Sequence, residues 1–167
     1  MNEIAITVVG RDRPGIVADV SARLAELGLN LTDSTMTLLR GHFAMMLICS
    51  GPVEVSVIRP ALADLDLVIS VGEAPPPGVI AAGVPYTLIV HGADRLGIVA
   101  AVTSAVAGAG GNITDLTTRL AGELYVLTAE LTLPDSADVA ALRATLEQVG
   151  RDLGVEVTLH AADADLL

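Results

Sequence analysis

The nine residues GRDRPGIVA at positions 10–18 decide the fold, because they return almost unchanged as GADRLGIVA at positions 92–100. At this constant offset of 82, the span 10–33 matches the span 92–115 at 13 of 24 positions. Self-similarity at a fixed spacing indicates a repeated structural unit. The chain of 167 residues is therefore predicted to hold two domains, each of roughly 75–80 residues.

Hydrophobic patterning predicts the order strand, helix, strand, strand, helix, strand in the first half. The expected strands are 3–9, 29–39, 43–49 and 66–72, and the expected helices are 14–27 and 53–65. The second helix is the least clear segment, because its β-branched residues favour a strand while residues 61–65 favour a helix. A helix is predicted there, with Pro60 near its start or at a kink.

The second half predicts the same order of elements more clearly. Its expected strands are 86–90, 112–120, 124–133 and 155–160, and its first helix is 96–109. The last helix shows the spacing of an amphipathic helix in its apolar residues Val139, Leu142, Leu146, Val149 and Leu153. Asp135 or Ser136 is the expected N-cap of that helix, and Gly154 is expected to end it.

These elements predict an α+β fold, with two tandem split-βαβ (ferredoxin-like) units of order βαββαβ. The first domain is expected over 1–73, a proline-rich linker over 74–83, the second domain over 84–162 and a tail over 163–167. Each antiparallel sheet would carry both helices on one face. Both alternating sets of residues 43–48 are apolar, and residues 125–127 behave alike, so the other face is expected to be apolar too. An exposed face of this kind predicts a homodimer.

Composition excludes several functional classes. Asp and Glu outnumber basic residues by 20 to 9, the net charge is −11, and no basic run exists in the sequence. Direct binding to nucleic acid or to an anionic membrane surface is therefore not expected. No apolar run reaches the length of about 18 residues that a transmembrane helix needs, and no signal peptide is expected. The single cysteine, Cys49, favours a cytoplasmic location.

The repeated loop is the candidate binding site. In each copy an Asp-Arg pair and a glycine stand between the first strand and the first helix, where unpaired N–H groups favour a carboxylate or a phosphate. Asn30 and Asn112 open the next strand, which is expected to start at the same end of the sheet as the loop. Their amides offer both a donor and an acceptor. The combination suits the carboxylate and ammonium groups of an amino acid.

Each of these residues also has a structural interpretation. Asp12 and Asp94 fit equally well as helix N-caps, and the two asparagines fit as turn residues. Arg13 and Arg95 are typical of solvated or ion-paired side chains. Thr32 and Thr114 are more typical of a strand surface than of a site.

Catalysis has little support in the sequence. The three histidines are far apart in the chain, and one cysteine provides no metal-ligand spacing, so no metal and no cofactor is expected. No phosphate-loop, dinucleotide or nucleophile-elbow motif is present. Asp33 and Asp115 have no basic or nucleophilic neighbour in the sequence.

The motif Gly-x-Asp-Arg-x-Gly-Ile-Val followed by Gly-x-Asn-Ile/Leu-Thr-Asp resembles the ACT domain, a regulatory module that binds small molecules. Two such units in tandem, over 3–73 and 84–160, are similar to the glycine cleavage system transcriptional repressor family. The resemblance implies one joined eight-stranded sheet with four helices on one face, and amino-acid binding between units. The resemblance implies ligand binding by Asp12, Gly15, Ile16 and Asn30 in the first copy, and by Asp94, Gly97, Ile98 and Asn112 in the second. The predicted ligand-binding set also includes their neighbours Arg13, Leu31, Arg95 and Ile113.

Two differences between the copies matter within the motif, where Pro14 becomes Leu96 and Leu29 becomes Gly111. The two sites need not be equally competent. The leading hypothesis is a non-enzymatic regulator that binds a small amino acid, such as glycine or serine, and modulates a partner protein, for example a DNA-binding regulator. One alternative is a ligand-free interaction module that docks through its apolar sheet face. A remote alternative is an acylphosphatase-like hydrolase, whose fold has the same order of elements.

Overall fold

The computed structural model describes residues 3–76, 78 and 82–162. The chain divides into two compact units, Met1–Gly78 and Val79–Leu167, and each is described by itself. Residues 77 and 79–81 of the expected linker lie outside the described residues, as does the expected tail 163–167. The exact domain and linker boundaries stay predictions.

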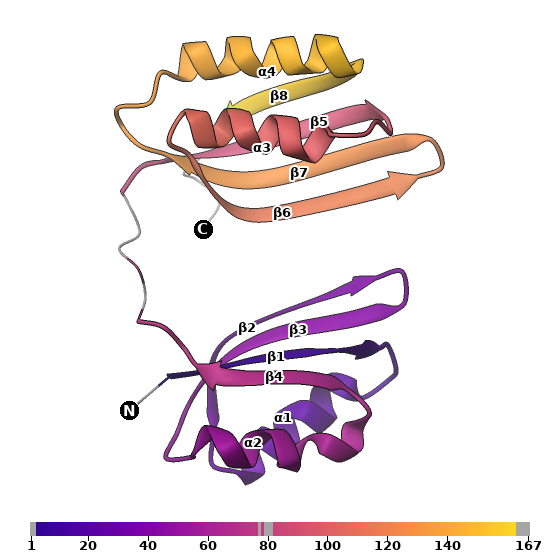
Figure 1. Ribbon diagram of the computed structural model, residues 1–167, viewed down its shortest axis with the longest axis vertical. Coiled ribbons are helices and arrows are strands. Elements are labelled where there is room, and N and C mark those ends of the chain that lie inside the picture. The colour runs from indigo at the N-terminus through magenta and orange to yellow at the C-terminus, as the bar shows by residue number, and fades with distance from the viewer. Residues whose placement is uncertain (1–2, 77, 79–81, 163–167) are drawn as a thin grey trace. The chain divides into compact units, whose positions relative to one another are not determined.

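The first unit follows the predicted order of elements (Figure 1). These elements are β1 (Glu3–Arg11), α1 (Ile16–Glu26), β2 (Asn30–Leu39), β3 (His42–Ser50), α2 (Val55–Ala61), the short 3-10 helix η1 (Ala63–Leu65) and β4 (Val68–Glu73). Alternation along β1 buries Ile4, Ile6 and Val8 against the helices. The core of this unit lies between that face of the sheet and α1 and α2.

The second unit repeats the arrangement with a longer last helix. Its elements are β5 (Val84–Ala93), α3 (Ile98–Gly108), β6 (Asn112–Ala121), β7 (Leu124–Leu133), α4 (Val139–Leu153) and β8 (Val155–Ala161). Gly154 has the left-handed conformation (φ 67°) that ends α4, as predicted. Val102 and Val106 of α3 and Leu142 and Leu146 of α4 contribute to the core beneath the helices.

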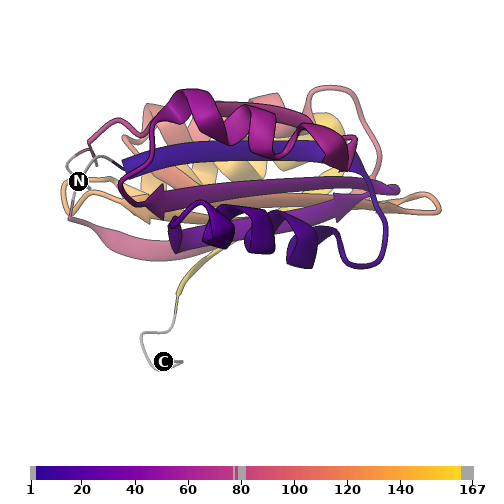
Figure 2. The same cartoon turned by 90° about the horizontal axis from the view of Figure 1, so that it is seen from below.

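Both sheets have the topology of the ferredoxin-like fold, which confirms the predicted fold class. The strand order is β2-β3-β1-β4 in the first sheet and β6-β7-β5-β8 in the second, and all neighbouring strands are antiparallel. Within each unit the two helices lie on one face of the sheet (Figures 1 and 2). Joining of the two sheets into one of eight strands stays a prediction.

Of the two predicted places for Pro60, near the start of the helix or at a kink, the first is wrong. Pro60 is the sixth of the seven residues of α2, near the end of the helix and not near its start. Proline has no N–H, and its ring clashes with the carbonyl four residues earlier, so the α-helix ends one residue later. The following strand also starts later than predicted, at Val68, because Asp66 adopts a left-handed conformation (φ 54°).

The cap of α4 is also not the predicted one. Asp138, and neither Asp135 nor Ser136, is the N-cap, and its side chain accepts a hydrogen bond of 2.9 Å from the backbone N–H of Ala141. Pro134, Asp135 and Ser136 precede the helix, and Ala137 N–H donates to the Pro134 carbonyl in a turn. This turn moves the start of the helix to Val139.

Replacing Asp138 with alanine is expected to destabilise the second unit by about 1 kcal/mol, because the N–H of Ala141 loses its acceptor. Asp135→Ala is the matched control, since it removes the same charge nearby without removing a cap, and it should change stability by less than about 0.5 kcal/mol. Urea unfolding followed by circular dichroism measures both. Equal costs for the two variants would contradict the assigned cap.

The face of each sheet opposite its helices is less uniform than predicted. In the first unit, Val9, Met46 and Val68 lie on this face and are 39%, 49% and 75% exposed, which agrees with the expected apolar face. In the second unit, Thr128 and Glu130 share this face of β7 with Leu124, which is 48% exposed, and Val126, so the face is mixed and the prediction holds only in part. The homodimer stays a prediction.

Candidate functional site

Both repeated loops enter their helices through a left-handed glycine. Gly15 (φ 83°) and Gly97 (φ 91°) are the N-caps of α1 and α3, and no side chain caps either helix. The interpretation of Asp12 and Asp94 as N-caps is therefore wrong. A Cβ at either glycine would meet no atom within 4 Å, so the positive φ, and not lack of space within the unit, accounts for glycine here.

The arginine of the first loop has a local partner. Arg13 forms an ion pair of 2.7 Å with Asp19 in the first turn of α1, and both side chains are largely exposed. The repeat has Ala101 in place of Asp19, and Arg95 has no ion-pair partner among the described residues. The ion-paired interpretation is thus confirmed for Arg13 and not for Arg95.

The asparagines do not lie at the loop end of their own sheets, which overturns the predicted geometry. Asn30 pairs with Ser50, and Ser50 pairs with Glu3 at the start of β1, whereas the loop follows Arg11 at the end of β1. The two ends are on the order of 26 Å apart, because a strand rises about 3.3 Å per residue. The second unit has the same arrangement, with Asn112 level with the start of β5 (Figure 1).

Chain direction explains this error. β2 is antiparallel to β3, and β3 is antiparallel to β1, so β2 runs parallel to β1. α1 returns the chain to the start of the sheet before β2 begins. No single unit therefore brings its own loop and its own asparagine together.

The threonines that follow the asparagines have a structural role. The register of each outer strand pair shifts at this point, between Leu31 and Asp33 in one unit and between Ile113 and Asp115 in the other. At the bulge, Thr32 Oγ1 donates to the Ile48 carbonyl (3.0 Å), and Thr114 Oγ1 donates to the Glu130 carbonyl (3.3 Å). The repeated Thr thus stabilises a β-bulge.

The apolar residues among the predicted site positions belong to the cores. Ile16 and Ile98 are 3% and 2% exposed, and Leu31 and Ile113 pack against the core clusters of their units. Their side chains position the loop and the strand start. Contact with a ligand at these positions would have to come from their backbone groups.

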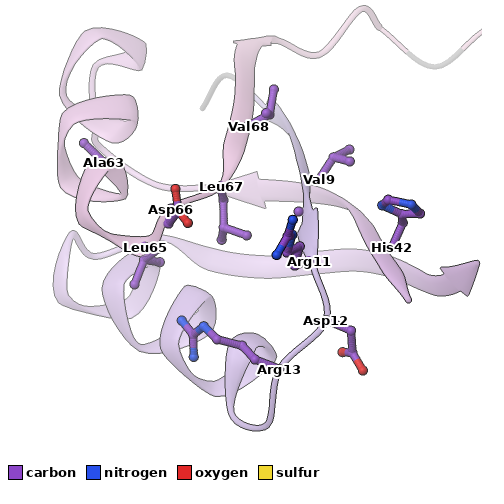
Figure 3. Close-up of a pocket in the computed structure, with 11 residues that line it drawn as sticks. Val9, Arg11, Asp12, Arg13, His42, Ala63, Leu65, Asp66, Leu67 and Val68 are labelled. Carbon is purple, nitrogen blue, oxygen red and sulfur yellow. The ribbon is translucent and has the colours of Figure 1, made fainter. Parts of the chain in front are cut away.

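A cleft of about 530 Å³ lies at the loop end of the first sheet (Figure 3). Its lining combines the end of β1 and the loop with the start of β3 and the segment from η1 to β4. The lining residues are Val9, Gly10, Arg11, Asp12, Arg13, His42, Ala63, Leu65, Asp66, Leu67 and Val68. Sequence reasoning found Asp12 and Arg13 but missed Arg11, His42 and Asp66, which only the strand pairing and the η1–β4 turn bring together.

Reactive side chains outside the cleft include Cys49 and His91. No group of three or more His, Cys, Asp or Glu side chains in the described part of the chain is arranged to hold a metal ion. Cys49 is buried, and burial raises the pKa of its thiol, which disfavours the nucleophilic thiolate. His91 Nε2 lies 3.2 Å from Glu156 Oε2 across β5 and β8. Among the described helices, none is both long and apolar enough to span a membrane.

The model of the ACT domain family matches residues 2–69 and 87–160. Among curated proteins, a UPF0237 protein of Streptococcus mutans is 60% identical over 46 residues, which cover 28% of this chain and 52% of the relative. A UPF0237 protein of Methanopyrus kandleri is 48% identical over 58 residues, covering 34% of this chain and 64% of the relative. The chain thus spans about half the length of the first of these relatives.

Two solved structures are similar over nearly the whole chain. An unknown protein from Galdieria sulphuraria has a TM-score of 0.81 at 30% identity, covering 96% of this chain and 98% of that one. A candidate glycine cleavage system transcriptional repressor has a TM-score of 0.67 at 19% identity, covering 95% and 96%. The second likeness shows a shared fold.

Proposed function

The chain belongs to the ACT domain family, with two ACT units in tandem, and on this premise we propose that it is a non-enzymatic regulator that binds a small amino acid between ACT units. Glycine and serine are the expected ligands. Binding changes how the protein contacts a partner protein. Because a ligand at an interface stabilises one arrangement of the units over others, it couples ligand concentration to that arrangement.

The observation that carries this proposal is the separation of loop and asparagine within each unit. Asn30 is level with the start of β1 and the loop follows its end, so one small ligand cannot touch both in the same unit. A ligand that uses both must take the loop from one unit and the asparagine from another. The second unit belongs either to the same chain or to a second copy, as in the proposed homodimer.

The chemistry of each half supports this division of roles. The loop supplies the N-terminal N–H groups of α1 or α3, which favour the ligand carboxylate. Asp12 and Asp94 are exposed in these loops and can accept hydrogen bonds from the ligand ammonium group. Asn30 or Asn112 supplies an amide that can donate or accept.

The differences between the copies have separate causes. Leu29 is 4% exposed, and its counterpart Gly111 leaves no room for a side chain, because a Cβ there would lie 2.7 Å from Val106 Cγ1. This difference is a matter of core packing. Leu96, the counterpart of Pro14, is fully exposed, so it affects only what approaches the second loop.

The charge of the protein bears on its partner. The net charge of −11 disfavours direct binding to the phosphates of nucleic acid. The regulator therefore acts on DNA only by binding a separate DNA-binding protein, and it does so in the cytoplasm. The similar fold of a candidate glycine cleavage system repressor agrees with a role in transcriptional regulation. The regulated pathway follows from the identity of the bound amino acid.

Calorimetric titration of the full chain with the twenty amino acids tests the proposal. Glycine or serine is expected to bind, and Asn112→Ala is expected to weaken that binding about tenfold, since one hydrogen bond to a charged group is lost. Gln148→Ala removes an amide from the exposed surface of α4 and serves as the control. Binding of none of the twenty amino acids would contradict the sensor function while leaving the fold assignment intact.

The exposed apolar face of the first sheet favours a second candidate function. Val9, Met46 and Val68 could dock a protein partner without any small ligand. In that case Met46→Asp abolishes partner binding, whereas Asn112→Ala has no effect. The two functions are therefore distinguished by the same set of variants.

A further inference from the structure

Arg11 and His42 are cross-strand neighbours at the loop end of the first sheet, and Arg40 stands two residues before His42 in the chain. Arg11 ends β1 and pairs in register with His42, the first residue of β3, so both lie on the same face of the sheet. Arg40 lies in the β2–β3 turn, with φ 50°. The Asp12 N–H donates a hydrogen bond of 3.1 Å to the Gly41 carbonyl in the same turn, which connects the turn to the loop. We call Arg11, Arg40 and His42 the basic corner.

The basic corner lacks acidic partners. Among the described residues, no ion pair and no side-chain hydrogen bond involves any of its three members. Acidic groups are abundant in this chain, so an unpaired cluster of basic groups at the mouth of a cleft calls for a ligand of opposite charge.

The carboxylates of the cleft do not neutralise the corner. Figure 3 shows the Asp12 carboxylate directed away from Arg11, and Leu67 lies between Asp66 and Arg11 in the same view. Arg13, the other basic residue of the lining, is already paired with Asp19. Arg11 and His42 are thus the groups of the cleft that can bind an anion.

The second unit provides an internal comparison. At the offset of 82, the three members of the basic corner correspond to Ala93, Gly122 and Leu124. The strand pairing agrees, because Ala93 pairs with Leu124 as Arg11 pairs with His42. The fold forms in the second unit without any of these basic groups, so they are not needed to build it.

The pair of residues beside the basic corner also differs in polarity between the two units. Val9 and Val68 are cross-strand partners in the first unit and line the cleft. Their counterparts His91 and Glu156 are also partners, but both are polar, and His91 Nε2 lies 3.2 Å from Glu156 Oε2. The second unit therefore has a carboxylate where the first has an apolar wall beside its basic corner.

We propose that the cleft of the first unit binds a small molecule that carries a compact anionic group, a carboxylate or a phosphate, at the basic corner. Arg11 and His42 contact the anionic group, and Val9, Leu67 and Val68 contact the rest of the molecule. The volume of about 530 Å³ is in the range of sites for small ligands. This cleft lies within one unit and shares Asp12 and Arg13 with the loop of the proposed amino-acid site, whereas Arg11 and His42 are not part of that site.

Titration of the full chain with inorganic phosphate and, separately, with succinate tests the proposal, with binding followed by NMR chemical shifts. At least one of the two anions is expected to bind at one site per chain, and the tighter one identifies the preferred anionic group. Arg11→Gln should weaken binding about tenfold, because a charge-assisted hydrogen bond is lost. Shifts in the NMR spectrum should map to the loop end of the first sheet.

Arg119→Gln is the matched control. Arg119 is exposed on β6 of the second unit, donates to the Thr118 carbonyl at 2.9 Å, and lies outside the cleft, so its loss should leave anion binding unchanged. The proposal is overturned if neither anion binds saturably, or if Arg119→Gln weakens binding as much as Arg11→Gln. Circular dichroism of both variants reports their folding. Asn112→Ala separates this site from the amino-acid site, since it should leave anion binding intact.

Discussion

Replacing Phe43 with alanine is expected to destabilise the first unit by about 3–5 kcal/mol, the usual cost of removing a buried aromatic ring. Phe43 is fully buried on the helix-facing side of β3. Its register partner on β1 is Gly10, which has no side chain that could fill the cavity. A domain of this size has a free energy of unfolding of about 5–15 kcal/mol, so the loss is a large fraction of its stability.

Met46→Ala is the control for this prediction. Met46 lies on the same strand, but on the opposite face, and is 49% exposed. Its removal should cost less than about 1 kcal/mol, because little apolar surface returns to water and no closed cavity forms. Urea unfolding followed by circular dichroism measures both variants. Similar costs would mean that the register of β3 is wrong.

Replacing Gly150 with alanine is expected to destabilise the second unit by about 1–3 kcal/mol. In the interior of a helix this substitution usually stabilises by about 0.5–1 kcal/mol. Here a Cβ would lie 2.7 Å from the backbone carbonyl oxygen of Val155, so the C-terminal turn of α4 and the start of β8 would have to move apart. A backbone atom cannot rotate away as the end of a side chain can.

Gly108→Ala provides the matched control, because Gly108 is also helical and a Cβ there would meet no atom within 4 Å. It should leave stability unchanged or raise it by up to about 1 kcal/mol. The midpoint of thermal unfolding should therefore fall for Gly150→Ala, and it should stay the same or rise for Gly108→Ala. Stabilisation by Gly150→Ala would show that α4 is not packed this closely on β8.

Much of the fold was predictable because local patterns and the repeat agree. β7 was predicted with its exact limits, since an apolar start at residues 124–127 and alternation up to Leu133 lie between a glycine turn and Pro134. Gly154 marked the end of α4, because glycine adopts the left-handed conformation at little cost. The prediction for the α4 cap failed because Asp135, Ser136 and Asp138 are all residue types that serve as N-caps, and sequence alone does not choose between them.

The candidate site was predictable only in its parts. The loop and the asparagine were both found, but the spacing between them does not say at which end of the sheet each lies. That depends on the direction of β2 relative to β1, which the pairing of both strands with β3 sets. The basic corner was missed because Arg11 and His42 are 31 positions apart in the chain and form no local motif.

By itself the sequence determined that the chain holds two copies of a βαββαβ unit, because a repeat with an offset of 82 and regular hydrophobic periods follow from covalent order alone. The tertiary structure decided which residues that are distant in the chain lie next to one another. Strand pairing put Arg11 beside His42, separated Asn30 from its own loop, and made the uncharged counterparts Ala93 and Leu124 register partners in the second unit. The physical reason is that register and strand direction arise from hydrogen bonds between segments distant in the chain, and local spacing does not encode them.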